Sequence, residues 1–127
     1  MNDTGARRLK EAGEFLQEAK FLLNEKLGNV HVLTKIYHSM IYGLFALFNI
    51  RSIGDLSHYE LIQMFKTAYI EKEGFSPSYQ EVLDLTYDLV HTCSCSDTRD
   101  IDLIDTDKAL SAANWLLKDI ADHLAGR

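Results

Sequence analysis

Proline is almost missing from this chain of 127 residues, and cysteine occurs only twice. The single proline, Pro77, leaves long stretches in which no proline ring interrupts a helix. The two cysteines, Cys93 and Cys95, are one residue apart, which is a poor separation for a disulfide within one regular element. We therefore interpret them as reduced thiols of a cytoplasmic protein rather than as a disulfide framework.

An excess of positive charge and a membrane-length apolar run are also missing. Lysine and arginine number 13 against 19 aspartates and glutamates, and the formal net charge of −6 argues against non-specific binding of DNA or RNA. The longest apolar stretch, residues 36–50, contains His38 and is too short to span a membrane. No apolar core of a signal peptide follows the first eight residues. We expect a cytoplasmic protein with no membrane contact.

Apolar residues recur at intervals of three and four, the period of amphipathic helices, and strand-like alternation is scarce. Helices are predicted over residues 6–26, 30–49, 57 or 58 to about 70, 77–90 and 106–124. With short connections, five helices favour a single domain over residues 1–127. Its fold class is all-α, an antiparallel helical bundle with a four-helix up-and-down core. Arg8 and Lys10 are expected on the polar face of the first helix.

The helix over residues 30–49 is apolar around most of its circumference, which is typical of a central helix. We expect it to pack against the first helix on one side and against later helices, or a second subunit, on the other. Glycines at 28 and 74 are predicted to end the first and third helices. Ser76 is placed to cap the fourth helix and Pro77 to open it.

Several polar residues of the predicted helices are candidates for a binding groove. Tyr37 shares the apolar face of its helix, so we expect it to be buried with its hydroxyl hydrogen-bonded. His38 lies off that face and is expected to border a groove or a subunit interface. His58 falls at a helix start, where it either anchors the preceding loop or serves a site. The complete candidate set is Tyr37, His38, His58, Asp88, His91 and Arg99.

The only ligand-like cluster is His91, Cys93, Cys95 and Asp97. Zinc favours cysteine and histidine, but this spacing is not that of a usual zinc knuckle, and alternate residues converge only on an extended backbone. We expect no metal site, with His91, Cys93 and Cys95 as weak candidates. The acidic residues from Asp97 to Asp107 lack the glycine and glutamate of a calcium loop and read as a solvated loop. No cofactor is expected, because glycine-rich phosphate loops and Ser/His/Asp signatures are missing.

Four segments, in order, carry the motifs of one family. Residues 15–23 end in Ala-x-x-Leu-Leu, residues 37–47 open with Tyr-His-Ser-Met, residues 57–65 contain His-x-x-Leu-x-x-x-Phe, and residues 81–89 follow. Together these segments resemble the HEPN domains, which are found in bacteria and archaea beside minimal nucleotidyltransferases and in toxin–antitoxin pairs. The resemblance covers most of residues 12–120.

The resemblance implies a homodimer, formed through the exposed side of the second and fourth helices. Its groove would face a nucleotide, an RNA or a partner nucleotidyltransferase. Active RNases of this family carry an arginine followed, after four to six residues, by a histidine at the end of the fourth helix. Here residues 90–95 read Val-His-Thr-Cys-Ser-Cys, and Arg99 is followed by no histidine until His123. The RNase motif is therefore lost or heavily altered, and we carry over no catalytic residue.

Three functional hypotheses follow. The leading one is a binding or regulatory module of the HEPN type that partners a nucleotidyltransferase or binds nucleotide or RNA. The second is a metal-independent endoribonuclease toxin that uses His91 with His58 or Arg99, which requires these groups within hydrogen-bond reach of one substrate. The third is a structural homodimer subunit without catalytic activity.

Overall fold

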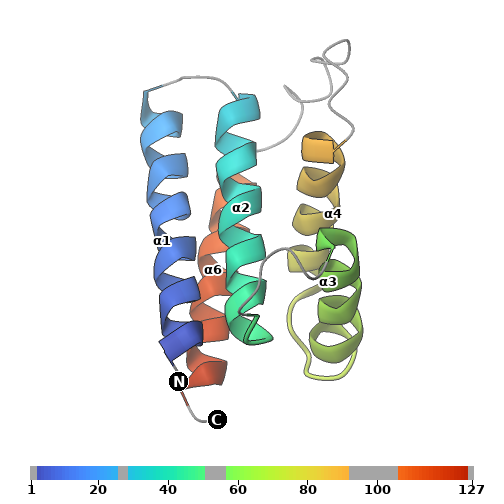
Figure 1. Ribbon diagram of the computed structural model, residues 1–127. Helices are drawn as coiled ribbons and strands as arrows, with labels where there is room; N and C mark the ends of the chain where they lie inside the picture. Colours follow the sequence, from blue (N-terminus) through green and yellow to red (C-terminus); the bar gives the residue numbers. More distant parts are fainter. Residues whose placement is uncertain (1–2, 26–28, 51–56, 92–105, 126–127) are drawn as a thin grey trace.

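The computed structural model describes residues 3–25, 29–50, 57–91 and 106–125, and no strand occurs among them. The elements are the α-helices α1 (Asp3–Asn24), α2 (Asn29–Leu47), α3 (His58–Phe65), α4 (Pro77–His91) and α6 (Thr106–Leu124), with the π-helical segment η2 (Lys66–Ile70). Figure 1 shows that α1, α2, α4 and α6 run alternately up and down. The predicted all-α antiparallel bundle is confirmed.

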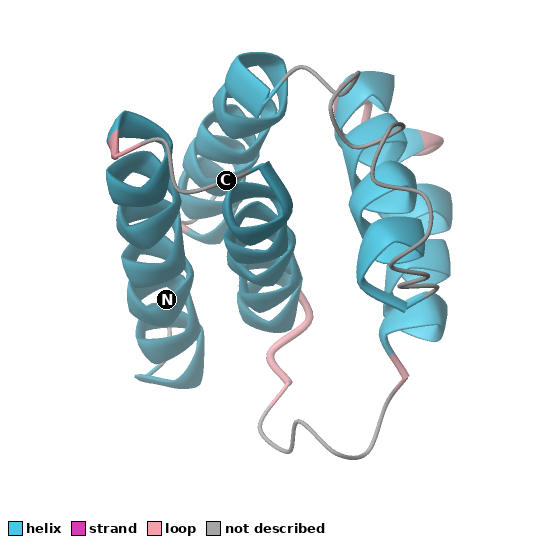
Figure 2. Cartoon of the chain, turned by 90° about the horizontal axis from the view of Figure 1, so that it is seen from above, coloured by secondary structure: helices cyan, strands magenta, loops and turns pink. Residues whose placement is uncertain are grey.

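The helix α2 lies at the centre of the bundle and contacts α1, α3, α4 and α6. Both views place α1 on one side of α2 and the pair α3 and α4 on the other (Figures 1 and 2). Among the α2 side chains that the structure describes, His31 alone is exposed. The apolar circumference of this helix is thus covered within the chain, and α2 offers little surface for the pairing of two copies through helix two that we expected.

Small residues allow the helices around α2 to approach it closely. Ala12 and Ala19 of α1 and Ala113 of α6 are fully buried. At Gly43, where α6 crosses α2, an added Cβ atom would lie 2.7 Å from the Cδ2 atom of Leu117. Small side chains at these positions leave room for the large buried side chains of α2.

The helix ends around α3 and α4 follow from local chemistry. Ser57 caps α3, since its side chain accepts a hydrogen bond from the Glu60 backbone N–H at 3.1 Å. The segment η2 extends this helix with π geometry, which periodicity does not predict. Gly74 has φ +78°, as expected for a residue that stops a helix, and Pro77 is the first residue of α4. The predicted stop at residue 28 lies outside the described residues.

Arg8 corrects one sequence-based expectation, because it is buried rather than on a polar face, with 5% of its surface exposed. Its Nε donates to the backbone oxygen of Ile50 at 3.2 Å, and its Nη1 pairs with Glu11 at 2.9 Å. The guanidinium also lies over the rings of Tyr42 and Phe45. A flat, delocalised cation tolerates this setting, because it packs on aromatic faces while its edge donates hydrogen bonds.

Large apolar side chains are also exposed at several points of the surface. They are Phe21, Tyr59, Met64, Leu85 and Trp115. Within the described ranges, no helix combines the length and hydropathy needed to cross a bilayer.

Candidate functional site

Two of the predicted candidates, Tyr37 and His58, meet where α2 packs against α3. The Tyr37 hydroxyl lies 2.7 Å from the Nδ1 atom of His58, and the Tyr37 side chain is completely buried. His58 is the first residue of α3, directly after the capping residue Ser57. The cap therefore fixes where the helix begins, and the tyrosine–histidine hydrogen bond attaches that end of α3 to the centre of the bundle.

The phenol of Tyr37 is held in its neutral form. Burial raises the pKa of Tyr37 well above its ordinary value, and the nearby Tyr87 raises it further. The neutral phenol donates to Nδ1 when that nitrogen carries no proton and accepts from it when that nitrogen is protonated. The hydrogen bond therefore survives either state of His58, which suits a positioning role better than proton transfer by Tyr37.

A series of aromatic rings leads from this pair to the surface. The Tyr37 ring centre lies 5.8 Å from that of His58 and 6.4 Å from that of Tyr87 on α4. The Tyr87 ring in turn lies 6.1 Å from that of Tyr59, the residue after His58. Tyr59 is 57% exposed. We call Tyr59 and Tyr87 the aromatic edge, because they bring this buried cluster into contact with solvent.

His38 is placed differently from His58. Its ring is half-buried, and its centre lies 5.5 Å from that of Phe15 on α1 and 5.5 Å from that of Tyr37. His38 lies off the main apolar face of α2, and the sequence predicts that it borders a groove or a subunit interface. In the structure its ring packs against α1 of the same chain.

Three carboxylates lie near the residues of the aromatic edge in the sequence. Glu60 follows Tyr59, Asp88 follows Tyr87, and Asp84 lies one turn before Asp88 on α4. All three of these acidic residues are exposed, and we call them the acidic rim. The charge of these carboxylates has the same sign as the net charge of the chain.

The remaining candidates are not placed by the structure. Arg99, Cys93 and Cys95 lie outside the described residues, as does the side chain of His91, the last residue of α4. The altered nuclease set and the weak metal candidates therefore remain sequence-based hypotheses. In the part of the chain that is described, no group of three or more histidines, cysteines and carboxylates is arranged to hold a metal ion.

Sequence reasoning missed both members of the aromatic edge. Tyr59 stands between a histidine and a glutamate, and Tyr87 lies beside the buried stripe of α4 rather than on it. Their contact depends on how α3 packs on α4, and the period of a single helix carries no signal for it.

Comparison with models of known protein families, with curated proteins and with solved structures gave no match.

Proposed function

We propose that this chain is a HEPN-type binding module that recognises a partner protein through the aromatic edge and the acidic rim. The observation that carries the proposal is Tyr59, a large side chain that is 57% exposed, lies next to the ring of Tyr87 and is followed in the sequence by the exposed Glu60. The partner would be a nucleotidyltransferase, the class of protein that the resemblance of residues 12–120 implies.

The chemistry of this surface favours a protein over a nucleic acid. Tyrosine is enriched in protein–protein interfaces, where its ring fills a pocket and its hydroxyl finds a polar partner. A nucleic acid would bring phosphates close to Glu60, Asp84 and Asp88, and no affinity is gained without cations that neutralise those phosphates. Lysine and arginine side chains on a protein partner instead complement the acidic rim and speed the encounter.

The buried pair behind the aromatic edge prepares it for binding. Tyr37 and His58 attach the start of α3 to α2, and the next residue is Tyr59. The backbone of Tyr59 is therefore ordered before the partner arrives, which lowers the entropy cost of binding. Tyr37 and His58 thus act as positioning residues.

Affinity purification of the tagged full chain from its own organism, followed by quantitative mass spectrometry, tests the proposal. The wild-type chain is expected to enrich a nucleotidyltransferase, and Tyr59→Ser is expected to lose it. Phe21→Ser is the matched control, because Phe21 is 60% exposed but lies on α1. Circular dichroism establishes that both variants are folded.

Two results would overturn the proposal. One is a wild-type chain that enriches no nucleotidyltransferase. The other is a nucleotidyltransferase that Tyr59→Ser retains as well as the wild type does. Recovery of RNA in its place, lost on mutation of Tyr59, would assign the aromatic edge to nucleic-acid binding instead.

A further inference from the structure

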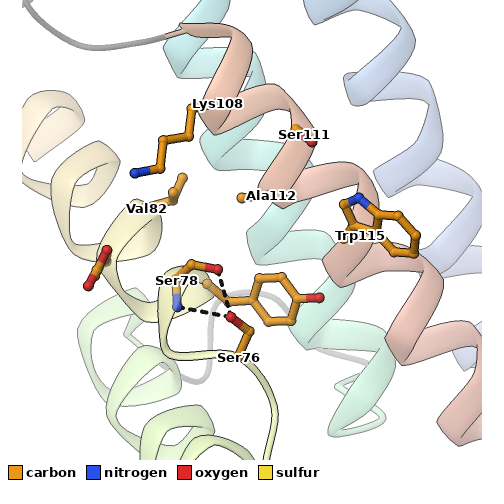
Figure 3. Close-up of a pocket in the computed structure, with 9 residues that line it drawn as sticks. Ser76, Ser78, Val82, Lys108, Ser111, Ala112 and Trp115 are labelled. Carbon is orange, nitrogen blue, oxygen red and sulfur yellow. Dashed lines mark hydrogen bonds between the residues drawn. The ribbon is translucent and has the colours of Figure 1, made fainter.

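A second surface of α4, away from the aromatic edge, carries a separate cavity. It lies between α4 and α6 and has a volume of about 380 Å³ (Figure 3). Glu81 and Val82 of α4 line it, whereas Tyr87 of the same helix packs against Tyr37 and Tyr59 and does not line it. The cavity is therefore independent of the proposed partner surface.

The apolar part of the cavity is contributed by both helices. Tyr79 and Val82 of α4 are almost completely buried and face Ala112 and Trp115 of α6. Trp115 is the only tryptophan of the chain and is 53% exposed. The Lys118 ammonium lies 4.9 Å from the centre of the Trp115 ring. This half-exposed indole beside a buried apolar wall is suited to cover an apolar or aromatic group of a ligand.

The polar part of the cavity carries one charge of each sign. Two charged residues line it, Lys108 of α6 and Glu81 of α4, and both are exposed. Ser76, Ser78 and Ser111 also line it. Figure 3 shows that the Lys108 side chain reaches from α6 toward Val82 on α4, with Trp115 farther along α6. An ammonium has three N–H donors, so Lys108 can serve a ligand while it keeps contacts within the protein.

The two charged residues restrict the net charge of a ligand that fits the cavity. A net anion would meet the Glu81 carboxylate, and a net cation would meet the Lys108 ammonium. A wholly apolar molecule would cover both charged groups and the serine hydroxyls without replacing their hydrogen bonds to water. A zwitterion brings a group of opposite charge to each side chain, since its carboxylate can add to the contacts of Lys108 and its ammonium can face Glu81.

We infer that this cavity binds a free amino acid with an apolar or aromatic side chain. The ammonium and carboxylate of the ligand lie between Lys108 and Glu81, and its side chain lies against Val82 and Trp115. The volume agrees with this size, because about 380 Å³ is at the lower end of the range for small-molecule sites.

Trp115 makes the inference directly measurable, because a single tryptophan reports on one place in the chain. Titration of the full chain with L-phenylalanine is expected to give a saturable blue shift of tryptophan emission, with a Kd below about 1 mM. Isothermal titration calorimetry supplies an independent Kd. L-phenylalaninamide, which lacks the carboxylate, and 3-phenylpropanoate, which lacks the ammonium, are each expected to bind at least tenfold more weakly.

Variants separate the two charges. Lys108→Met and Glu81→Gln are each expected to weaken phenylalanine binding at least tenfold, whereas Lys10→Met on α1 leaves it unchanged. Circular dichroism and the thermal midpoint establish that each variant is folded. Three results would overturn the inference: no saturable change with the wild-type chain, equal binding of the three ligands, or a Lys108→Met variant that binds like the wild type. A Trp115 emission that shifts with protein concentration alone would mean that a second copy fills the cavity, and would also overturn it.

Discussion

Removal of the Tyr37 hydroxyl is the sharpest test of how α3 is held to the bundle. Tyr37→Phe keeps the buried ring and deletes only the oxygen that lies 2.7 Å from His58 Nδ1. A hydrogen bond of this kind contributes about 0.5–1.5 kcal/mol net, and a buried partner left unsatisfied costs about 1–3 kcal/mol. His58 is half-buried, so water replaces part of the lost contact. We expect the free energy of unfolding to fall by about 1.5 kcal/mol.

Urea denaturation followed by circular dichroism measures this loss, and for a chain of this size the same change lowers the Tm by about 6 °C. Tyr59→Phe is the matched control, because it removes the hydroxyl of an exposed tyrosine one residue from His58. The control is expected to change the free energy of unfolding by less than about 0.5 kcal/mol. If Tyr37→Phe proves as stable as Tyr59→Phe, the hydrogen bond does not hold α3 in place.

Three further substitutions or conditions test the packing. Gly13→Ala is expected to raise the free energy of unfolding by about 0.5–1 kcal/mol in a urea titration, because an added Cβ meets no atom within 4 Å. Gly43→Ala is expected to raise the free energy of unfolding by less, because the added Cβ forces Leu117 of α6 to move. Arg8→Ala is expected to lower the thermal midpoint and to cost about 2–3 kcal/mol, since it removes the hydrogen bond to the Ile50 oxygen, the pair with Glu11 and the packing of a buried side chain. Arg7→Ala, at an exposed position, is expected to stay within about 0.5 kcal/mol. Burial raises the pKa of Tyr37 above its ordinary value of about 10, so the unfolded chain releases this proton at lower pH than the folded chain does. The stability from this group is therefore complete below about pH 10 and is lost as the pH rises further, and urea titrations across that range are expected to show a smaller alkaline loss for Tyr37→Phe.

Much of the fold could be predicted because each helix is specified by its own residues. The apolar circumference of residues 30–49 placed α2 at the centre, and Pro77 marked the start of α4. Arg8 was misplaced, because periodicity treats every arginine as a surface residue. Whether its guanidinium packs on Tyr42 and Phe45 depends on the neighbouring helix.

The candidate site could be predicted only in part, for a similar reason. Tyr37 was expected to be buried with its hydroxyl satisfied, and it is, but the partner lies 21 residues away on another helix. The contact between Tyr59 and Tyr87 and the cavity between α4 and α6 also depend on residues of two helices. Contacts between helices depend on crossing geometry, which hydrophobic spacing within one helix does not specify.

The central proposal is that the aromatic edge binds a nucleotidyltransferase. Isothermal titration calorimetry tests it most directly, with this chain and the nucleotidyltransferase that it enriches as the two purified proteins. The wild-type chain and Phe21→Ser are expected to bind with equal Kd, and Tyr59→Ser at least tenfold more weakly, as for an interface hot spot of about 1.4 kcal/mol or more. Added salt is expected to weaken wild-type binding, because the acidic rim pairs with basic side chains of the partner. No measurable binding by the wild-type chain, or equal affinity for Tyr59→Ser, would contradict the proposal.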